Sequence, residues 1–356
     1  MKETRSRALE QICADLETCI KSSLQDTESC LAFWAAIPQT RSGCNDLTTF
    51  SSREAVLAYA YQHLPRRYLR VWDALSALTA RACLPLGRHG VRVLDIGTGP
   101  GTIAFAINDF YQALRNFGEE QCIELLARQT TRFSTVESNK NMQGFLSYFR
   151  EVTERFFPTD GMYADFTTFS PQAERKQYYD SLLREEDFNE FEGEFEPAFT
   201  EYEANLEAQG VARFRFVVMS YFLTTPEALQ LFQTALVELV RDLRPGSVVM
   251  LLGAPGHEPI HRDVESIMDA GHFRRLPEVP EQLDTTDELE AMLKRSQHRV
   301  FEHLASIVGA DRLPRDGYPD YWYPEPHPKV QTAFRLTAFR KGRWPNARKV
   351  KSVLSH

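Results

Sequence analysis

A glycine-rich stretch, VRVLDIGTGPGTIAFA at residues 91–106, has the residue types and spacing best suited to chemistry. Apolar, β-branched residues lead into it, Asp95 follows them, and Gly97, Gly99 and Gly101 come next. This order predicts a buried strand, a tight turn and the start of a helix. Alternating glycines let the backbone of such a turn approach a ligand closely.

Three kinds of ligand compete for the turn. A nucleoside-triphosphate loop ends in a glycine followed by lysine, which is absent here. A dinucleotide turn of the form GxGxxG needs its third glycine at position 102, which is Thr102. Asp95 would repel a pyrophosphate, whereas a carboxylate there suits a cationic group such as an α-ammonium or a sulfonium.

The segment VLDIGTGPGT resembles motif I of the class I S-adenosylmethionine-dependent methyltransferases. Later segments resemble that family in order: FSTVESN, GMYADFTTF, FRFVVMSYFLTT and LRPGSVVMLLGAPG. The resemblance implies S-adenosylmethionine as cofactor, with Glu137 accepting from the ribose hydroxyls and Asp165 meeting the adenine amino group. The residues that it places at the cofactor are Asp95, Gly97, Thr98, Gly99, Gly101, Glu137, Ser138, Asp165, Phe166 and Ser220.

A second resemblance is to the methyltransferase-like family of mitochondrial small-ribosomal-subunit assembly factors. It lies in the arrangement of SSREAVLAYAYQHLPRRY, motif I, MSYFLTT and GAPGHEPIHRDVESI. That family carries a cysteine cluster downstream of motif I, whereas this chain has only Cys122 there. The resemblance therefore gives no support for a cluster.

The residues after the fourth expected strand limit the chemistry of the methyl acceptor. Enzymes that methylate adenine or glutamine amino nitrogens resemble one another in an Asn/Asp-Pro-Pro-Tyr/Phe turn, where this chain has Ser220-Tyr221-Phe222-Leu223. Enzymes acting on pyrimidine C5 need a nucleophilic cysteine, and none occurs beyond Cys122. O- or N-methylation of a small molecule or peptide remains.

Two residues are candidates for the catalytic site. Tyr221 is placed to contact the acceptor or the donor, although a packed aromatic at a strand end is an equal interpretation. His257 is the first choice for a general base, because an imidazole titrates near neutral pH; a loop histidine at the surface is the alternative. Further aromatic residues would line the cleft or pack against the sheet: Tyr59, Tyr61, His63, Tyr68, Tyr318, Tyr321, Trp322 and Tyr323.

Short apolar runs alternate with helical segments from Val91 onward. They predict an α/β fold, a doubly wound and mostly parallel seven-stranded sheet, with the last strand able to insert antiparallel. The expected strands are Arg92–Ile96, Arg132–Val136, Gly161–Ala164, Arg213–Ser220, Ser247–Gly253, Phe273–Leu276 and Thr332–Arg340.

A helical cap is expected over residues 1–87, before a methyltransferase domain over residues 88–356. One amphipathic helix opens the cap, and a second begins at Ser51 or Ser52 with Glu54 placed for a capping box and a break or kink at Pro65. Insertions are expected at 167–212 and 277–330. The first is strongly acidic, which suits a solvated face, a lid that attracts a basic peptide or amine, or a partner contact.

Composition sets limits on location and partners. Hydrophobic content of 43% is that of a globular protein, no run is long enough for a membrane span, and the start lacks a signal peptide, so we expect a cytoplasmic protein. A net charge of −8 disfavours nucleic acid, apart from a basic tail over residues 340–351, which suits either solvent or RNA. All six cysteines precede residue 123 without a CxxC pair, predicting buried reduced thiols and no metal site. A scaffold that binds the cofactor without catalysis stays open, as does the oligomeric state.

Overall fold

The computed structural model describes residues 2–40, 50–87, 90–167, 169, 214–276, 282–283, 287–313 and 334–342. The acidic residues from 170 to 212, the aromatic residues 318–323 and the tail from 343 lie outside these ranges. Among the described helices, none is both long enough and apolar enough to cross a bilayer.

One mixed sheet organises the chain, and its order is β3-β2-β1-β4-β5-β8-β6, with β7 pairing onto β8 off this path. The five strands from β3 to β5 are parallel, whereas β8 is antiparallel to both β5 and β6. This confirms the predicted doubly wound, mostly parallel fold with an antiparallel last strand. The bounds are β1 Val91–Ile96, β2 Thr131–Val136, β3 Thr159–Tyr163, β4 Phe216–Ser220, β5 Val248–Gly253, β6 Phe273–Arg275, β7 Gln282–Leu283 and β8 Phe334–Lys341.

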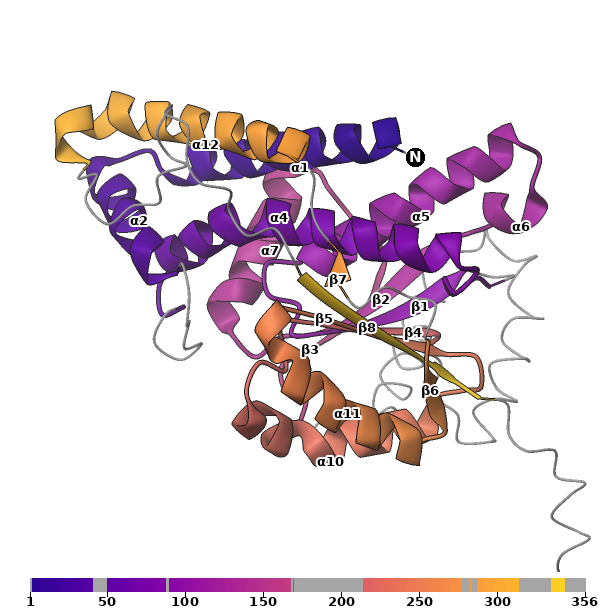
Figure 1. Ribbon diagram of the computed structural model, residues 1–356. Helices are drawn as coiled ribbons and strands as arrows, with labels where there is room; N and C mark the ends of the chain where they lie inside the picture. Colours follow the sequence, from indigo (N-terminus) through magenta and orange to yellow (C-terminus); the bar gives the residue numbers. More distant parts are fainter. Residues whose placement is uncertain are drawn as a thin grey trace, which may run out of the picture.

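Helices cover both faces of the sheet (Figure 1). Alternate strand residues point to opposite faces, and in β1 Val91 and Val93 join the core beneath α4, α5 and α7, while Leu94 and Ile96 join the core above α10 and α11. By the same alternation, Asp95 lies on the α4 face. The bounds of these helices are α4 Arg53–Ala80, α5 Thr102–Glu120, α7 Lys140–Thr153, α10 Pro226–Asp242 and α11 Glu258–Ala270.

A further layer of helices lies over α4. It contains α1 (Lys2–Ser23) and α2 (Thr27–Gln39) from the predicted cap together with α12 (Asp287–Val308) from the predicted second insertion, and α1 and α12 run side by side (Figure 1). Arg299 of α12 donates to both oxygens of Glu17 on α1, at 2.6–3.1 Å. The insertion helix is therefore part of the N-terminal packing. The short elements are α6 Glu124–Ala127, η1 Pro255–His257 and η2 Ala310–Arg312.

Helix α4 begins as expected but differs in two details. Ser52 is its N-cap, and its hydroxyl accepts from the backbone N–H of Ala55 at 3.1 Å. Because Ala55, and not Glu54, occupies the third helical position, the predicted capping box is wrong. Of the predicted break or kink at Pro65, the break is wrong, since α4 continues through this residue to Ala80. Its length lets one helix reach from the cap to the sheet.

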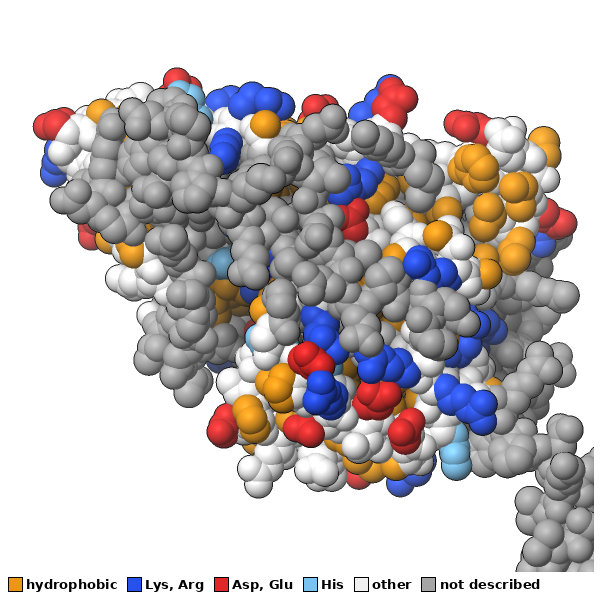
Figure 2. All heavy atoms as spheres, viewed as in Figure 1, with side chains coloured by type: hydrophobic (Ala, Val, Ile, Leu, Met, Phe, Trp, Pro, Cys, Tyr) orange, Lys and Arg blue, Asp and Glu red, His pale blue; other side chains and the backbone are white. Residues whose placement is uncertain are grey.

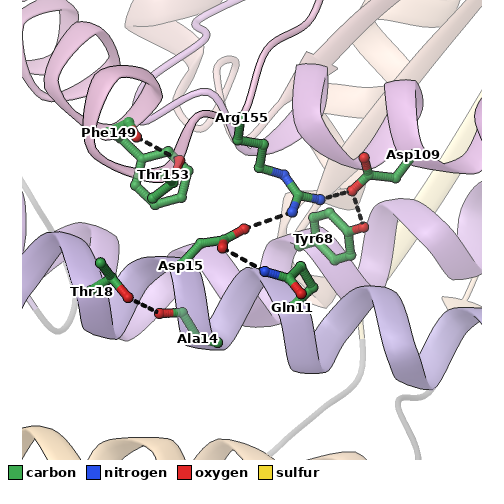
Figure 3. Close-up of polar contacts among 9 residues, drawn as sticks. All are labelled: Gln11, Ala14, Asp15, Thr18, Tyr68, Asp109, Phe149, Thr153 and Arg155. Atoms are coloured by element: carbon green, nitrogen blue, oxygen red, sulfur yellow. Dashed lines mark hydrogen bonds and ion pairs between the residues drawn. The ribbon is translucent and has the colours of Figure 1, made fainter.

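Arg155, just after α7, joins three segments that are distant in sequence (Figure 3). Its guanidinium donates to Asp15 of α1 at 2.7 Å and to Asp109 of α5. Asp109 also accepts from the hydroxyl of Tyr68 on α4, and Asp15 accepts from Gln11 at 2.8 Å. Only 14% of the Arg155 side chain is exposed. The network fixes α1 and α4 against α5.

Exposed apolar side chains gather at the far end of α5 and over α6, seen as orange spheres at the upper right of Figure 2. They include Phe117, Ile123 and Leu125, each more than 40% exposed. Because α5 follows β1 and runs antiparallel to it, this end lies at the amino edge of the sheet. The patch is therefore far from the carboxyl edge, where the glycine turn lies.

Two compositional predictions need correction. Cys13, Cys19, Cys30 and Cys83 are buried free thiols as predicted, but Cys122 is exposed. Lys341, assigned to the basic tail, is 5% exposed in β8 and donates to the carbonyls of Val240 and Arg241 at 2.7–2.8 Å. That lysine holds the end of α10 and is unavailable for RNA. Cys44 lies outside the described residues.

Replacing Arg155 by alanine should strongly destabilise the protein. The variant leaves the buried Asp15 and the largely buried Asp109 without their shared cation, at a cost of about 3–5 kcal/mol. Urea unfolding measures the change. The matched control is Arg128→Ala on the exposed pair with Glu124, which should change the free energy of unfolding by less than about 1 kcal/mol. Equal effects in the two variants would contradict the structural role of Arg155.

Candidate functional site

The turn after β1 depends on its three glycines, which all adopt left-handed backbone conformations. The φ angles of Gly97, Gly99 and Gly101 are +73°, +53° and +81°. A Cβ at Gly97 would lie 2.6 Å from the ring of Phe222, and one at Gly101 would lie 2.5 Å from Leu146. For a Cβ at Gly99, the nearest atom among the described residues would be the carbonyl oxygen of Gly97, at 4.0 Å. The first and third glycines are thus needed for packing, whereas a Cβ at the middle one would make no close contact with the described residues.

Asp95 is the most unusual side chain of the site. It is fully buried at the end of β1, and neither carboxylate oxygen has a hydrogen-bond partner among the described residues. Burial, followed by repulsion from Glu137, raises the pKa of its carboxyl to about 8, although the nearby Thr98 hydroxyl opposes this rise. By its geometry that hydroxyl bonds the backbone carbonyl of Asp95 and not the carboxyl. A buried charge without a partner is costly, so the protein on its own disfavours the ionised form.

Glu137, at the end of β2, holds the glycine turn. Its two oxygens accept from the backbone N–H groups of Gly99 at 2.7 Å and Asn139 at 2.8 Å. Since β2 lies beside β1, with Thr135 opposite Asp95, the two acids meet at one edge of the sheet. The structure thus brings Asp95 and Glu137, two of the residues predicted to contact the cofactor, to the same edge of the sheet.

Other polar atoms near Asp95 also lack partners among the described residues. They are the buried hydroxyls of Thr135 in β2, Ser220 in β4 and Thr102 at the start of α5. Thr98, by contrast, donates to the backbone carbonyl of Asp95 at 3.1 Å. Buried polar groups are normally satisfied. Several buried polar groups without a hydrogen-bond partner among the described residues lie at the carboxyl edge of the sheet. This indicates that a polar ligand binds there.

The remaining cofactor candidates have different surroundings. Asp165 accepts from the backbone N–H of Thr167 at 2.8 Å and from its hydroxyl at 2.6 Å, so its carboxylate stabilises the turn after β3. Phe166 is buried and packs on the ring of Phe222, which contacts the glycine turn. Ser138 is exposed. Phe166 thus reaches the turn through Phe222.

Tyr221 directly follows β4 and has a φ of +55°, which is uncommon for a residue other than glycine. Its ring faces two arginines of α4. The guanidinium carbon of Arg67 lies 4.4 Å from the ring centroid, and Arg70 donates to the Tyr221 hydroxyl. Strained backbone often accompanies a functional site. Here it presents an aromatic hydroxyl next to two cations.

His257 lies beside Tyr221, with their ring centroids 6.1 Å apart. The structure thus brings the two predicted catalytic residues together. However, Nδ1 of His257 accepts from the backbone N–H of Ala254 at 3.2 Å, which places the proton of the neutral ring on Nε2. Burial lowers the pKa of His257. The lone pair that a base needs is therefore already engaged.

Sequence reasoning missed Arg67 and Arg70. The segment PRRYLR at 65–70 held the signal, since arginines three residues apart lie on one helical face. Of the aromatic residues predicted to line the cleft from this helix, Tyr59 contacts Arg67. The others make structural contacts: Tyr61 with Gln297, His63 with Thr40, and Tyr68 with Asp109.

The geometry separates charges along the carboxyl edge. Asp95 and Glu137 lie at the ends of β1 and β2, and the arginines of α4 lie over the end of β4. Such a site can hold a ligand with a cationic group at one position and an anionic group at another.

No known protein family and no curated protein matches the chain. Among solved structures, the N-methyltransferase NodS from Bradyrhizobium japonicum WM9, in complex with S-adenosyl-L-homocysteine, is 12% identical, with a TM-score of 0.35 over 87% of this chain and 98% of that one. The arsenic(III) S-adenosylmethionine methyltransferase CrArsM from Chlamydomonas reinhardtii is 13% identical, with a TM-score of 0.31 over 74% and 67% of the chains.

A likeness this distant does not bear on activity. The assignment of the fold therefore depends on the order and direction of this chain's own strands. The resemblance to the ribosome-assembly family is not tested by these comparisons and stays a prediction.

Proposed function

We propose that the chain is an S-adenosylmethionine-dependent O- or N-methyltransferase that binds the donor at the carboxyl edge of the sheet. The observation that carries this proposal is the Asp95 carboxylate, which is fully buried and has no hydrogen-bond partner among the described residues. A ligand that brings an ammonium and a sulfonium would supply the missing cation. A pyrophosphate would add a second negative charge and raise the cost of burial.

The other donor contacts follow from the same edge. Both Glu137 oxygens accept backbone N–H groups of the turn, and we propose that this carboxylate also accepts from the ribose diol of the donor. At Gly99, where a Cβ would come no closer than 4.0 Å to a described residue, the ligand would lie next to the backbone. The adenine would lie toward Asp165 and Phe166 on β3, with the carboxylate of Asp165 kept in place by Thr167.

Bound donor supplies an activated methyl group, and the protein's task is to align an acceptor with it. Tyr221 and His257 lie at the acceptor side, where they orient the incoming group through the phenol oxygen and through Nε2–H. Because Nδ1 of His257 is already engaged, we propose an acceptor atom that carries its own free lone pair. Alignment alone accounts for much of the acceleration of such a transfer.

The acceptor is proposed to be a small molecule or a peptide. Of the basic tail expected to contact RNA, Lys341 donates to the end of α10 and Arg340 donates to the carbonyl of Ala82, whereas the residues from 343 lie outside the described ranges. One experiment distinguishes a methyltransferase from a scaffold that binds the donor without turnover. Incubation of the protein with labelled donor and cell extract forms S-adenosylhomocysteine only if methyl transfer occurs.

Replacing Asp95 by asparagine should weaken S-adenosylhomocysteine binding by about 30-fold or more. Removal of one member of a buried charge pair costs about 2–5 kcal/mol, and the amide cannot neutralise the ligand ammonium. Isothermal calorimetry measures the affinity, with Glu124→Gln on exposed α6 as the matched control. Unchanged affinity in the Asp95 variant would reject the proposed cofactor site.

The same variant should stabilise the ligand-free protein at alkaline pH. The pKa of Asp95 is raised to about 8, so wild-type stability is complete below the unfolded pKa near 4 and falls as pH rises through 8. Asparagine does not titrate. The melting temperature of the variant should thus exceed that of wild type more at pH 8 than at pH 5. A pH-independent difference would show that the carboxyl is not perturbed.

Binding should also release a proton near neutral pH. Asp95 is mostly protonated in the free protein below pH 8, and a ligand ammonium favours its ionised form. At pH 6.5, the calorimetric enthalpy of S-adenosylhomocysteine binding should vary with the ionisation enthalpy of the buffer, with a slope near one released proton. A slope near zero would mean that the ammonium does not reach Asp95.

A further inference from the structure

Arg67 and Arg70 form a compact cationic pair on the face of α4 that meets the sheet. Their spacing of three residues places them on one helical face. Arg67 lies against two rings, 4.4 Å from the centroid of Tyr221 and 5.0 Å from that of Tyr59. Arg70 is 5.7 Å from the Tyr221 centroid and donates to its hydroxyl. The three side chains together form one cluster.

The charge of this cluster is not balanced by the described residues. Asp73, one turn further along α4, pairs with Arg5 at 2.6 Å. Among the described acids, none forms an ion pair with Arg67 or Arg70. The Nε of Arg70 is buried and has no acceptor within the described ranges.

The excess of positive charge also affects the pKa values of two residues of α4. Burial, assisted by Arg67 and other arginines of this helix, lowers the pKa of His63 to about 3. Burial and the neighbouring arginines also lower the pKa of Arg70. An anion placed here would relieve both effects.

The cluster borders the glycine turn. In the parallel register, Ile96 lies opposite Met219, so Tyr221 follows β4 just as the turn follows β1. Phe222, the next residue, would meet a Cβ on Gly97. A ligand at the turn therefore lies next to Tyr221 and the arginines above it.

We propose that Arg67, Arg70 and Tyr221 form an oxyanion-binding site that recognises a carboxylate or phosphate group of a ligand bound beside the glycine turn. A guanidinium stacked by its face on an aromatic ring keeps its in-plane N–H groups for a planar or tetrahedral oxyanion. The left-handed backbone of Tyr221 turns its ring and hydroxyl toward the arginines.

The inference deepens the proposed function and rests on it in placing the ligand. Two sources would supply the oxyanion: the amino-acid carboxylate of the donor, or an acidic group on the acceptor. Both share one chemistry. Arg67 and Arg70 disfavour a purely cationic acceptor, such as a basic peptide or a free polyamine, because their charges would repel it.

The test compares Arg67→Gln, Arg70→Gln and Arg70→Lys with wild type. Arg128→Gln on exposed α6 is the matched control. Calorimetry gives the affinities for S-adenosylhomocysteine and for 5′-methylthioadenosine, which has the nucleoside and sulfur but lacks the amino-acid group. A second titration adds inorganic phosphate or benzoate to protein saturated with S-adenosylhomocysteine. Circular dichroism and melting curves verify that each variant is folded.

If the donor supplies the oxyanion, each glutamine variant weakens S-adenosylhomocysteine at least 10-fold and leaves 5′-methylthioadenosine unchanged. If the acceptor supplies it, donor affinity is retained and binding of phosphate or benzoate is lost. Arg70→Lys keeps the charge and should fall between wild type and Arg70→Gln. The inference is overturned if no titration of the folded glutamine variants differs from wild type.

The two proposals fail separately. Wild type that does not bind S-adenosylhomocysteine refutes the proposed function. The ligand-free protein is then titrated with phosphate and benzoate: binding that depends on Arg67 and Arg70 still supports the oxyanion site, and no such binding overturns it.

Discussion

A carboxylate buried without a partner is the constraint on which the rest of the site depends. Asp95 has no exposed surface and no hydrogen bond to either oxygen among the described residues, beside a turn that only glycines can form. The protein tolerates this because the carboxyl is held largely protonated. The cationic group of the proposed ligand would offset the free-energy cost of burying this carboxyl. A site of this kind is selective, since a ligand without the cation gains nothing from it.

The second part of the site carries positive charge, opposite to that of the acids. Helix α4 places Arg67 and Arg70 over Tyr221, whereas Asp95 and Glu137 lie at the ends of the neighbouring strands. Positive and negative groups on one edge suit a ligand that carries both charges, as an amino acid does. This separation arises from two periodicities: alternate residues of β1 face α4, and residues three apart on α4 face the sheet.

Distant parts of the chain keep α4 in position. Arg155 ties α1 and α5 together, and Tyr68 of α4 shares the Asp109 carboxylate. Helix α12 packs on α1 through the Glu17–Arg299 pair. The helical layer therefore acts on the site indirectly, by setting the height of the arginines above the strand ends.

Local sequence was sufficient for the sheet, the glycine turn and the acids at its edge, because strand alternation and left-handed glycines are short-range properties. It also allowed for an antiparallel last strand. It failed where contacts join remote residues: the α1–α12 packing, the unbroken α4, the burial of Lys341 and the cluster of Arg67, Arg70 and Tyr221. The arginines were visible in the chain, but their partners were not. Which acids stay available to pair with them was decided by the tertiary structure alone, since Asp73 is one turn away yet binds Arg5.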